Sequence, residues 1–470
     1  MATTGKLDKS TVLALGAMGV AVLVIANDFT ALSVAIPSIE NDLHTGLDTA
    51  QWVINIYALV FGVLIVTGGR LADMFGRRTT FFLGAAIFAV FSVLGGASPG
   101  IGWLLAARAL MGIGGAMMWP SILGMTYQVV PKEKAGLAGG LILGAAGFGN
   151  AIGPMFGGFL TDAFSWRWIF FVNVPIAALG VAVTWLVIPP DAKAGGERGI
   201  DYPGMVALTV GLVSFLVALD EGPTEGWGDP LIIGLFCVGV VSLVAFASLE
   251  RRAGSGALVP PTVLRNIQFR AAALAVLLMS AIFFAALVYL PQFMQKNLRY
   301  APLEAGAGLL PMMGTFALTS FAAGPLYERV GAKRIVAAGA AALAVGMFLL
   351  SRVDSTWDYW SLVPGMVVVG IGVGIFYSSI TTAAVTALDP SQASLAGAIV
   401  YMFQIAGGAI GLGLNTAIVT SESLVSGIAT AFLVDAVLAL AGLVVVVLFV
   451  GGRAHPGHLV PLRGHYRAHA

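Results

Sequence analysis

Two charged residues lie within long apolar stretches near the start of the chain. Asp28 is in the stretch 11–37, and Arg108 is in LLAARALMGIGGA. An ionised side chain at membrane depth is costly and is usually retained for ion or substrate handling. If both stretches cross a bilayer, each charge lies ~10 Å from the same membrane face at 1.5 Å per residue. The spacing therefore favours a contact between Asp28 and Arg108.

The pair has two interpretations. In the functional one, Asp28 binds and releases a proton under the influence of Arg108 or of a bound substrate. In the other, a static buried ion pair fixes the register of two helices. A second intramembrane acid, Asp435, lies in the last apolar stretch, and the sequence offers no partner for it. Because the last helix of a bundle tends to be peripheral, a substrate role is less expected for Asp435.

The composition is that of a membrane protein. Hydrophobic residues make up 58% of the 470 residues and charged residues only 10%, against about 25% charge in soluble domains. The net charge of +1 gives no indication of a nucleic-acid partner. A single cysteine, Cys237, excludes an internal disulfide and a multi-cysteine metal site. No Gly-rich phosphate-binding motif occurs, so ATP drive is unsupported. We expect no cofactor, no metal site and no enzymatic activity.

Stretches long enough to cross a bilayer, about 20 apolar residues each, number fourteen. They are predicted at 12–36, 52–69, 79–98, 101–125, 138–160, 168–188, 203–219, 230–249, 270–293, 303–325, 334–351, 359–384, 394–418 and 427–450. Basic residues favour the cytoplasmic side of a membrane. If both termini are in the cytoplasm, all but five of the 24 Lys and Arg residues lie on the cytoplasmic side of the membrane. The exceptions are Arg108, Arg167, Lys296, Arg299 and Arg352.

An internal repeat divides the chain into halves. GRLADMFGRR (69–78) and GPLYERVGAK (324–333) are 255 residues apart, close to the separation between the first and ninth stretches. Because a two-helix insert leaves the second half parallel to the first, the repeat predicts two six-helix bundles with two helices between them. The expected division is 1–190 for the first bundle, 191–265 for cytoplasmic loops and the inserted helices, 266–452 for the second bundle, and 453–470 for a basic tail.

The first copy of the repeat carries a candidate cytoplasmic gate. An acid there can face a helix N-terminus and pair with following arginines, forming a latch that differs between open and closed states. The alternative is a basic loop that only fixes topology. The candidate gate residues are Gly69, Asp73, Gly76, Arg77 and Arg78.

The fifth stretch contains Gly149, Gly153 and Gly157 at four-residue spacing, with Pro154 among them. The glycines form a bare strip on one helix face that allows close packing, and proline invites a kink. We interpret the strip as a hinge or a seal between the halves, or as ordinary tight packing. A weaker echo occurs at 406–413.

Polar and aromatic residues within the stretches are candidates for lining a substrate cavity, although for each one alone packing or a place in the interfacial aromatic belt is the more expected role. They are Asn27, Asn55, Tyr57, Tyr289, Gln292, Tyr377, Tyr401 and Gln404.

These motifs together resemble the major facilitator superfamily, in particular its fourteen-helix drug:proton antiporter branch. The resemblance spans nearly the whole chain and includes DFTALSVAIP (28–37), QWVINIYALVFG (51–62), GRLADMFGRR, GNAIGPMFGG and WRWIFFVNVP (166–175) in the expected order. It implies two bundles that rock around a central cavity. It also implies proton coupling at Asp28 and Arg108, a cytoplasmic gate at Asp73 and Arg77, and an antiporter helix at Gly153 and Pro154. The second copy of the repeat departs from the pattern, because Ala332 and Lys333 replace the two arginines.

The function that we expect is proton-coupled export of amphipathic small molecules, such as drugs, antibiotics or lipophilic cations, with one proton per cycle at Asp28. The protein would be a monomer in the plasma membrane. The alternatives are a dedicated exporter of one metabolite or lipid, a proton symporter, and a membrane sensor that does not transport.

Overall fold

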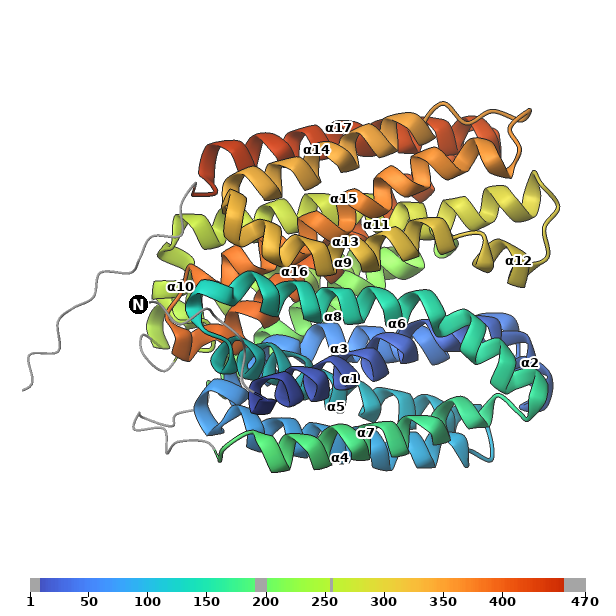
Figure 1. Cartoon of the computed structure of the whole chain (residues 1–470). Helices are drawn as coiled ribbons and strands as arrows, with labels where there is room; N and C mark the ends of the chain where they lie inside the picture. Colours follow the sequence, from blue (N-terminus) through green and yellow to red (C-terminus); the bar gives the residue numbers. More distant parts are fainter. Residues whose placement is uncertain (1–8, 191–200, 254–256, 452–470) are drawn as a thin grey trace, which may run out of the picture.

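The computed structural model describes residues 9–190, 201–253 and 257–451, and its regular structure in these ranges is helical (Figure 1). Fourteen helical segments of 18 to 32 residues are long and apolar enough to span a membrane, which confirms the predicted number. Several extend beyond the apolar stretches; the span predicted at 101–125 is the helix Ile101–Val129. The proposed linker region 191–200 and the basic tail 453–470 lie outside the described residues.

The first half contains six long helices and one short one. They are α1 (Lys9–Ala31), α2 (Ile36–Asp42), α3 (Leu47–Phe75), α4 (Arg77–Gly96), α5 (Ile101–Val129), α6 (Ala135–Ala163) and α7 (Arg167–Val187). The second half repeats this order. It contains α10 (Pro261–Arg265), α11 (Ile267–Lys296), α12 (Pro302–Ala307), α13 (Leu310–Val330), α14 (Ala332–Leu350), α15 (Tyr359–Thr386), α16 (Ala393–Ser421) and α17 (Leu424–Phe449).

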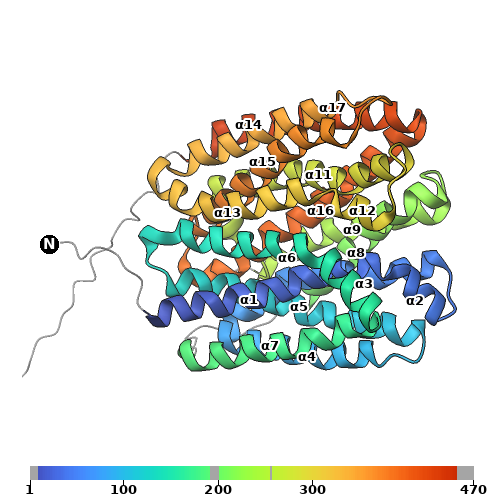
Figure 2. The same cartoon turned by 45° about the vertical axis from the view of Figure 1, so that its right-hand side comes forward.

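The two halves lie side by side with their long helices roughly parallel (Figures 1 and 2). We call the end of the molecule where α1 begins the Lys9 face, and the other end the opposite face. Within the halves, α5 packs on α3 and α4, and α15 packs on α13 and α14. Between the halves, α6 packs on α13 and α15, and α16 packs on α3 and α5. The fifth long helix of each half therefore provides most of its contact with the other half.

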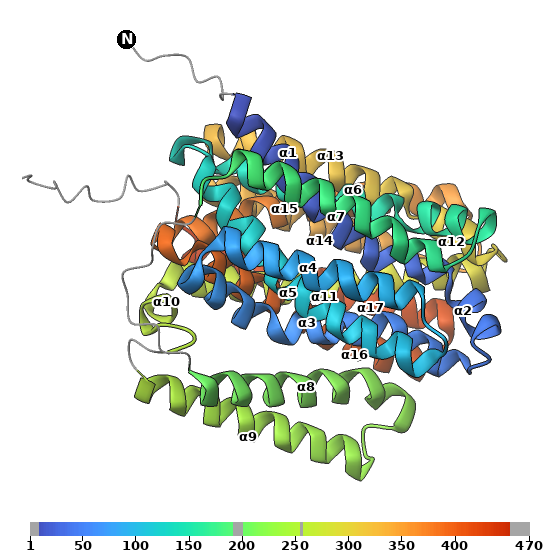
Figure 3. The same cartoon turned by 90° about the horizontal axis from the view of Figure 1, so that it is seen from below.

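The two inserted helices, α8 (Tyr202–Glu225) and α9 (Pro230–Ala253), form an antiparallel pair beside the main body (Figure 3). α8 packs on α3 from the first half and on α16 from the second. α9 packs mainly on α8, and its apolar side chains are largely exposed. An exposed apolar surface of this kind is suited to lipid.

The repeated motif is not a loop, as the sequence interpretation had it, but the end of one helix and the start of the next. α3 runs to Phe75, a single residue, Gly76, makes the turn, and α4 begins at Arg77. Gly76 has φ 109°, and Gly331 has φ 89° at the same point of the second half. Because residues with a Cβ rarely adopt such angles, glycine allows each pair of helices to be joined by one residue.

Candidate functional site

The side chains of Asp28 and Arg108 form an ion pair between α1 and α5. Arg108 Nη1 donates to Asp28 Oδ2 over 2.5 Å, and both side chains are completely buried. The long apolar helices bring the two residues to the same depth, as their positions in the sequence predicted. The charges lie far from water, so each depends on the other and on nearby dipoles.

The other oxygen of the Asp28 carboxylate is held by α7. Asn173 Nδ2 donates to Asp28 Oδ1 over 2.9 Å, and it lies 3.4 Å from Ser92 Oγ on α4. Ser92 in turn donates to the backbone oxygen of Phe170. Asp28 thus accepts one hydrogen bond from a charged donor, Arg108, and one from a neutral donor, Asn173. The hydrogen bond from Asn173 does not involve Arg108.

Arg108 has further partners on α3. Its Nε donates to the backbone oxygen of Val53 over 2.7 Å, and its guanidinium carbon lies 4.2 Å from the centroid of the Tyr57 ring. The face of an aromatic ring attracts a cation. Arg108 Nη2 has no hydrogen-bond partner among the described residues. Tyr57, expected as a cavity residue, is fully buried here as a support for Arg108.

The glycine strip of α6 packs on α1 around Asp28. A Cβ at Gly149 would lie 3.0 Å from the Leu23 backbone oxygen, and one at Gly157 would lie 2.0 Å from the Ala31 backbone oxygen. Gly153 faces Thr30 in the same way, one residue before Pro154. The strip therefore lies inside the first half and not between the halves, where a seal would need it. The echo at 406–413 packs correspondingly on α11, with Gly407 close to Leu277 and Gly411 close to Ala281.

Aromatic rings connect the ion pair to the second half. Tyr57 and Phe29 are 4.8 Å apart between ring centroids, and Phe29 and Phe61 are 5.4 Å apart. Tyr401 on α16 then lies 5.5 Å from Phe61 and 4.6 Å from Trp119. A change at Arg108 can thus reach α16 through contacting rings.

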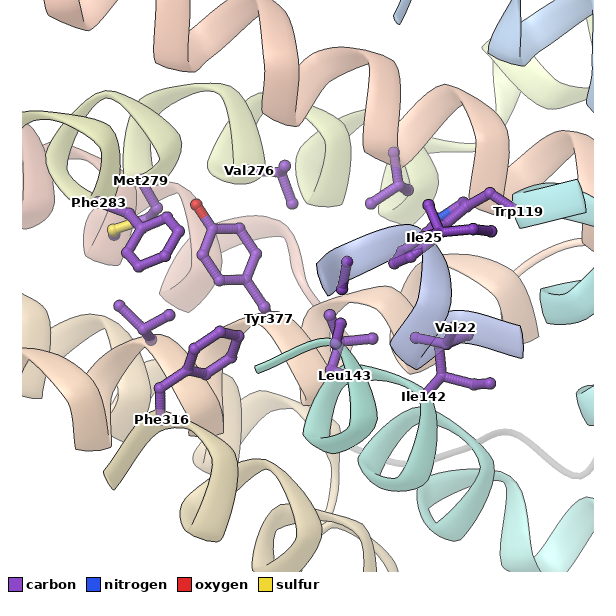
Figure 4. Close-up of a cluster of buried hydrophobic side chains, with 14 of the residues drawn as sticks. Val22, Ile25, Trp119, Ile142, Leu143, Val276, Met279, Phe283, Phe316 and Tyr377 are labelled. Carbon is purple, nitrogen blue, oxygen red and sulfur yellow. The ribbon is translucent and has the colours of Figure 1, made fainter. Parts of the chain in front are cut away.

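The centre of the molecule is apolar. Figure 4 shows Val22, Ile25 and Trp119 of the first half near Ile142, with Leu143 of α6 between this group and a second one. The second group is formed by Met279, Phe283, Phe316 and Tyr377 of the second half.

The candidate gate residues bind across the halves at the Lys9 face. Asp73 Oδ1 accepts from Arg77 Nε and Nη2, both at 3.1 Å. Its Oδ2 accepts from the backbone N–H of Leu395, the third residue of α16, at 2.9 Å. Arg77 also donates to the backbone oxygens of Gly124 and Pro390. The four contacts join α3, α4 and α5 to the start of α16.

Two further gate positions have different surroundings. At Gly69, a Cβ would lie 2.7 Å from Ala398 Cβ and 3.0 Å from the Ser394 backbone oxygen, so this glycine lets α3 approach α16. Arg78 points the other way, within the first half, where its Nη2 donates to the backbone oxygen of Trp185 over 3.0 Å.

The close contact between the halves on the other side involves glycines that the sequence analysis missed. A Cβ at Gly136 of α6 would lie 2.4 Å from the backbone oxygen of Gly324 on α13, and one at Gly140 would lie 2.8 Å from that of Ser320. Glu328 accepts from the backbone N–H of Leu137 over 3.3 Å. The halves are therefore in contact along two helix crossings at the Lys9 face. The four-residue spacing of Gly136 and Gly140 was the available signal.

The remaining cavity candidates are dispersed. Tyr377 OH is 2.8 Å from Ser280 Oγ, and Tyr289 OH is 2.7 Å from Thr416 Oγ1. Asn27 is buried, whereas the other candidates are partly exposed, namely Asn55, Gln292, Tyr401 and Gln404. Among the described residues, no three of His, Cys, Asp and Glu are grouped so that they could hold a metal ion.

At the opposite face, a surface ion pair ties α2 to α7. Arg167 Nη1 donates to Asp42 Oδ2, which also accepts from Trp166 Nε1 at 3.2 Å. The hydrogen bond from Arg167 lowers the pKa of Asp42 below its ordinary value of 3.8. The pair fixes the position of the connection between α1 and α3, and so the end of α1 at the opposite face.

Asn173 and Asn415 are the functional candidates that the sequence analysis overlooked within the spans. Asn173 donates to Asp28, and Asn415 donates to Asp435, which is completely buried although much of α17 is exposed, as expected for a peripheral helix. Other amides within the spans, such as Asn55 and Gln404, were among the predicted cavity residues, and the same criterion would have found Asn173 and Asn415.

Comparisons with known proteins agree with the geometry. The sequence matches the Major Facilitator Superfamily over residues 18–313 and 272–466. It is 35% identical to the puromycin resistance protein pur8 of Streptomyces alboniger, over 85% of this chain and 80% of that one. It is 31% identical to the tetracenomycin C resistance and export protein of Streptomyces glaucescens, over 84% of this chain and 73% of that one.

A solved structure shares the fold. The human organic anion transporter MFSD10 superimposes with a TM-score of 0.66 at 13% identity, covering 93% of this chain and all but 1% of that one. At this identity the likeness concerns the fold alone. Together with the sequence matches and the fourteen spanning helices, it leads to one conclusion: the chain is a multi-pass membrane protein that belongs to the Major Facilitator Superfamily.

Proposed function

We propose that the protein exports amphipathic small molecules in exchange for protons by alternating access, and that Asp28 is the proton carrier. The Lys9 face would be cytoplasmic, with both termini inside and the protein working as a monomer in the plasma membrane. Support comes from the excess of basic residues assigned to that face and from relatives named for antibiotic resistance and export.

The observation that carries the proposal is the buried ion pair of Asp28 with Arg108. A proton on Asp28 cancels its charge and leaves Arg108 unpaired, and breaking a buried pair typically costs about 3–5 kcal/mol. Here the cost is partly offset, because the Tyr57 ring and the Val53 oxygen remain in contact with the guanidinium. A desolvated cation–π contact contributes about 2 kcal/mol.

The second requirement is that the charge of Asp28 is felt by the contact between the halves. When Asp28 is neutral, Arg108 is free to shift toward Tyr57, whose ring belongs to the cluster that reaches Tyr401 of α16. α16 is also the helix that Asp73 holds at the Lys9 face. Protonation of Asp28 can therefore bias the contact that Asp73 makes at the Lys9 face, because α16 takes part in both contacts as one rigid helix.

The energetics favour exchange when the substrate is a cation. An inside-negative membrane potential opposes exit of a monovalent cation by about 2.3 kcal/mol per 100 mV. One proton entering for each cation leaving cancels this electrical work. The drive is then the proton gradient, about 1.36 kcal/mol per pH unit.

A second candidate is a dedicated exporter of one compound. Two of the relatives are named for single antibiotics, puromycin and tetracenomycin C. A panel of these two compounds and lipophilic dyes such as ethidium, tested as substrates in proteoliposomes, separates the two candidates. Transport of several unrelated compounds supports the multidrug exporter, and transport of one supports the dedicated exporter.

The test of proton coupling is Asp28→Asn, which keeps the shape of the side chain and removes its charge. In proteoliposomes with an imposed pH gradient, the variant is expected to lose proton-driven accumulation while still exchanging labelled for unlabelled substrate across the membrane. A matched control is Asp354→Asn, which changes an exposed acid whose side chain accepts from Thr356. Full pH-driven transport by Asp28→Asn would refute the role of Asp28.

A further inference from the structure

A second buried acid has surroundings unlike those of Asp28. Asp435 of α17 is completely buried, as is Asn415 of α16. Asn415 Nδ2 donates to both carboxyl oxygens of Asp435, at 3.2 and 3.1 Å. Asn415 Oδ1 has no hydrogen-bond partner among the described residues, although it is buried. Asp435 therefore has one neutral amide as its partner, and that amide has an unused acceptor.

No cation lies in ion-pair contact with Asp435 in the described part of the chain. Its helix packs on α11, α14 and α16. α11 brings one titratable side chain, Tyr289, within electrostatic reach, and α16 contains no charged residue. The basic residues of α11 and α14 lie at the helix ends, namely Arg270, Lys296, Lys333 and Arg334. Asp435 itself lies eleven residues into α17, ~16 Å from its start at 1.5 Å per residue.

We propose that Asp435 and Asn415 form a second proton-binding site, in the second half of the protein, and that Asp435 is a neutral carboxylic acid at neutral pH. A buried ionised carboxylate without a cation or several donors is costly, so the group takes up a proton instead. A protonated carboxyl pairs well with a primary amide: Nδ2 donates to the carboxyl C=O, and after rotation of the amide Oδ1 accepts from the carboxyl O–H. The otherwise unused acceptor of Asn415 would then be satisfied.

Two hydroxyl groups lie close to the site. Thr416, next to Asn415 on α16, is partly exposed, and its Oγ1 is 2.7 Å from the hydroxyl of Tyr289. Hydroxyl groups both donate and accept hydrogen bonds, and Tyr289 lies within electrostatic reach of Asp435. As part of an exchange cycle, which rests on the proposed function, the site would raise the number of protons per substrate from one to two.

The first test needs no transport. Infrared difference spectroscopy distinguishes the carbonyl stretch of a protonated carboxyl from the bands of a carboxylate. In the purified full chain at neutral pH, subtracting the spectrum of Asp435→Asn should reveal one protonated carboxyl in the wild-type protein. In Asn415→Ala the same band should remain but shift to higher frequency, because the acid loses its hydrogen-bonded partner. Absence of the band at neutral pH would overturn the proposal.

The second test counts protons. In proteoliposomes that transport a substrate of the panel above, Asp435→Asn should lower the proton-to-substrate ratio by one and leave substrate transport coupled through Asp28. An unchanged ratio would overturn the part of Asp435 in exchange. This result differs from failure of the proposed function, which is full pH-driven transport by Asp28→Asn. If Asp435→Asn does not fold, the band shift in Asn415→Ala still decides whether the acid is protonated.

Discussion

Asp73 and Glu328, 255 residues apart in the sequence, make the same contact with opposite halves of the molecule. Asp73 accepts from the N–H of Leu395 at 2.9 Å, and Glu328 accepts from the N–H of Leu137 at 3.3 Å. Each donor is the third residue of the fifth long helix of the other half. Because a helix N-terminus carries partial positive charge, each acid stabilises the contact between the halves at the Lys9 face.

The two latches are expected to differ in strength. Asp73 is buried and shared with Arg77, whereas the residue four positions after Glu328 is Ala332, where the first copy of the repeat has Arg77. We expect Asp73→Ala to open the Lys9 face more than Glu328→Ala. Hydrogen bonds to charged groups contribute about 1.5–3 kcal/mol, so Asp73→Ala should raise opening by about tenfold or more.

The measurement is the maleimide labelling rate of a cysteine placed at Leu395, which is buried between the halves, in a Cys237→Ser background. A cysteine at Leu343, buried inside the second half, reports general unfolding and should be labelled at an unchanged rate. Equal rates at position 395 with and without Asp73 would contradict the latch.

The helix crossing at Gly324 should not tolerate a side chain. A Cβ there would lie 2.6 Å from the backbone oxygen of Gly136, so Gly324→Ala must push α6 and α13 apart. Overpacking typically costs about 1–3 kcal/mol. Here it destabilises the conformation in which the two halves are in contact at the Lys9 face. Gly314→Ala on the same helix has open space and serves as the matched control. Faster labelling at position 395 for Gly324→Ala alone is expected; equal rates for the two variants would show that the crossing is adaptable.

Removal of both partners of the Asp28–Arg108 pair should cost less than the sum of the two single removals. Asp28→Asn leaves a buried cation, and Arg108→Gln leaves an acid whose remaining donor is Asn173. Each is expected to lower the free energy of unfolding by about 3–5 kcal/mol. The double variant should recover about 1–3 kcal/mol relative to their sum. Thermal unfolding in detergent measures all four proteins, and strict additivity would mean that the pair is not coupled.

The Asp42–Arg167 pair predicts a small dependence of stability on pH. The folded-state pKa of Asp42 is lowered, so its contribution is fully present above 3.8 and is lost as pH falls through the folded pKa. Because both side chains are partly exposed, the contribution is at most about 1 kcal/mol. Asp42→Asn should therefore lower the melting temperature slightly at neutral pH, and the difference should vanish in acid. A difference that persists or grows in acid would contradict this assignment.

The sequence alone was sufficient for the architecture, because the bilayer imposes one requirement on every span. Fourteen apolar runs predict fourteen helices, since lipid offers no other partner for backbone groups. Depth along a helix follows from counting at constant rise, so the shared depth of Asp28 and Arg108 was also predictable. The repeat likewise predicted that Asp73 and Glu328 occupy equivalent positions in the two halves.

Which face of each helix meets which neighbour could be decided only by the tertiary structure. Apolar residues surround these helices on all sides, so no periodic pattern distinguishes a face toward lipid from one toward another helix. The glycines of 149–157 were therefore interpreted as a hinge or a seal between the halves, or as ordinary tight packing, and the structure places them against α1 within the first half. Gly136 and Gly140 were missed. For the same reason Asp435 was left without a partner until α16 brought Asn415 to it. Depth is a property of one helix and can be read from its sequence; a contact depends on the rotation of two helices about their axes, which side-chain packing alone fixes.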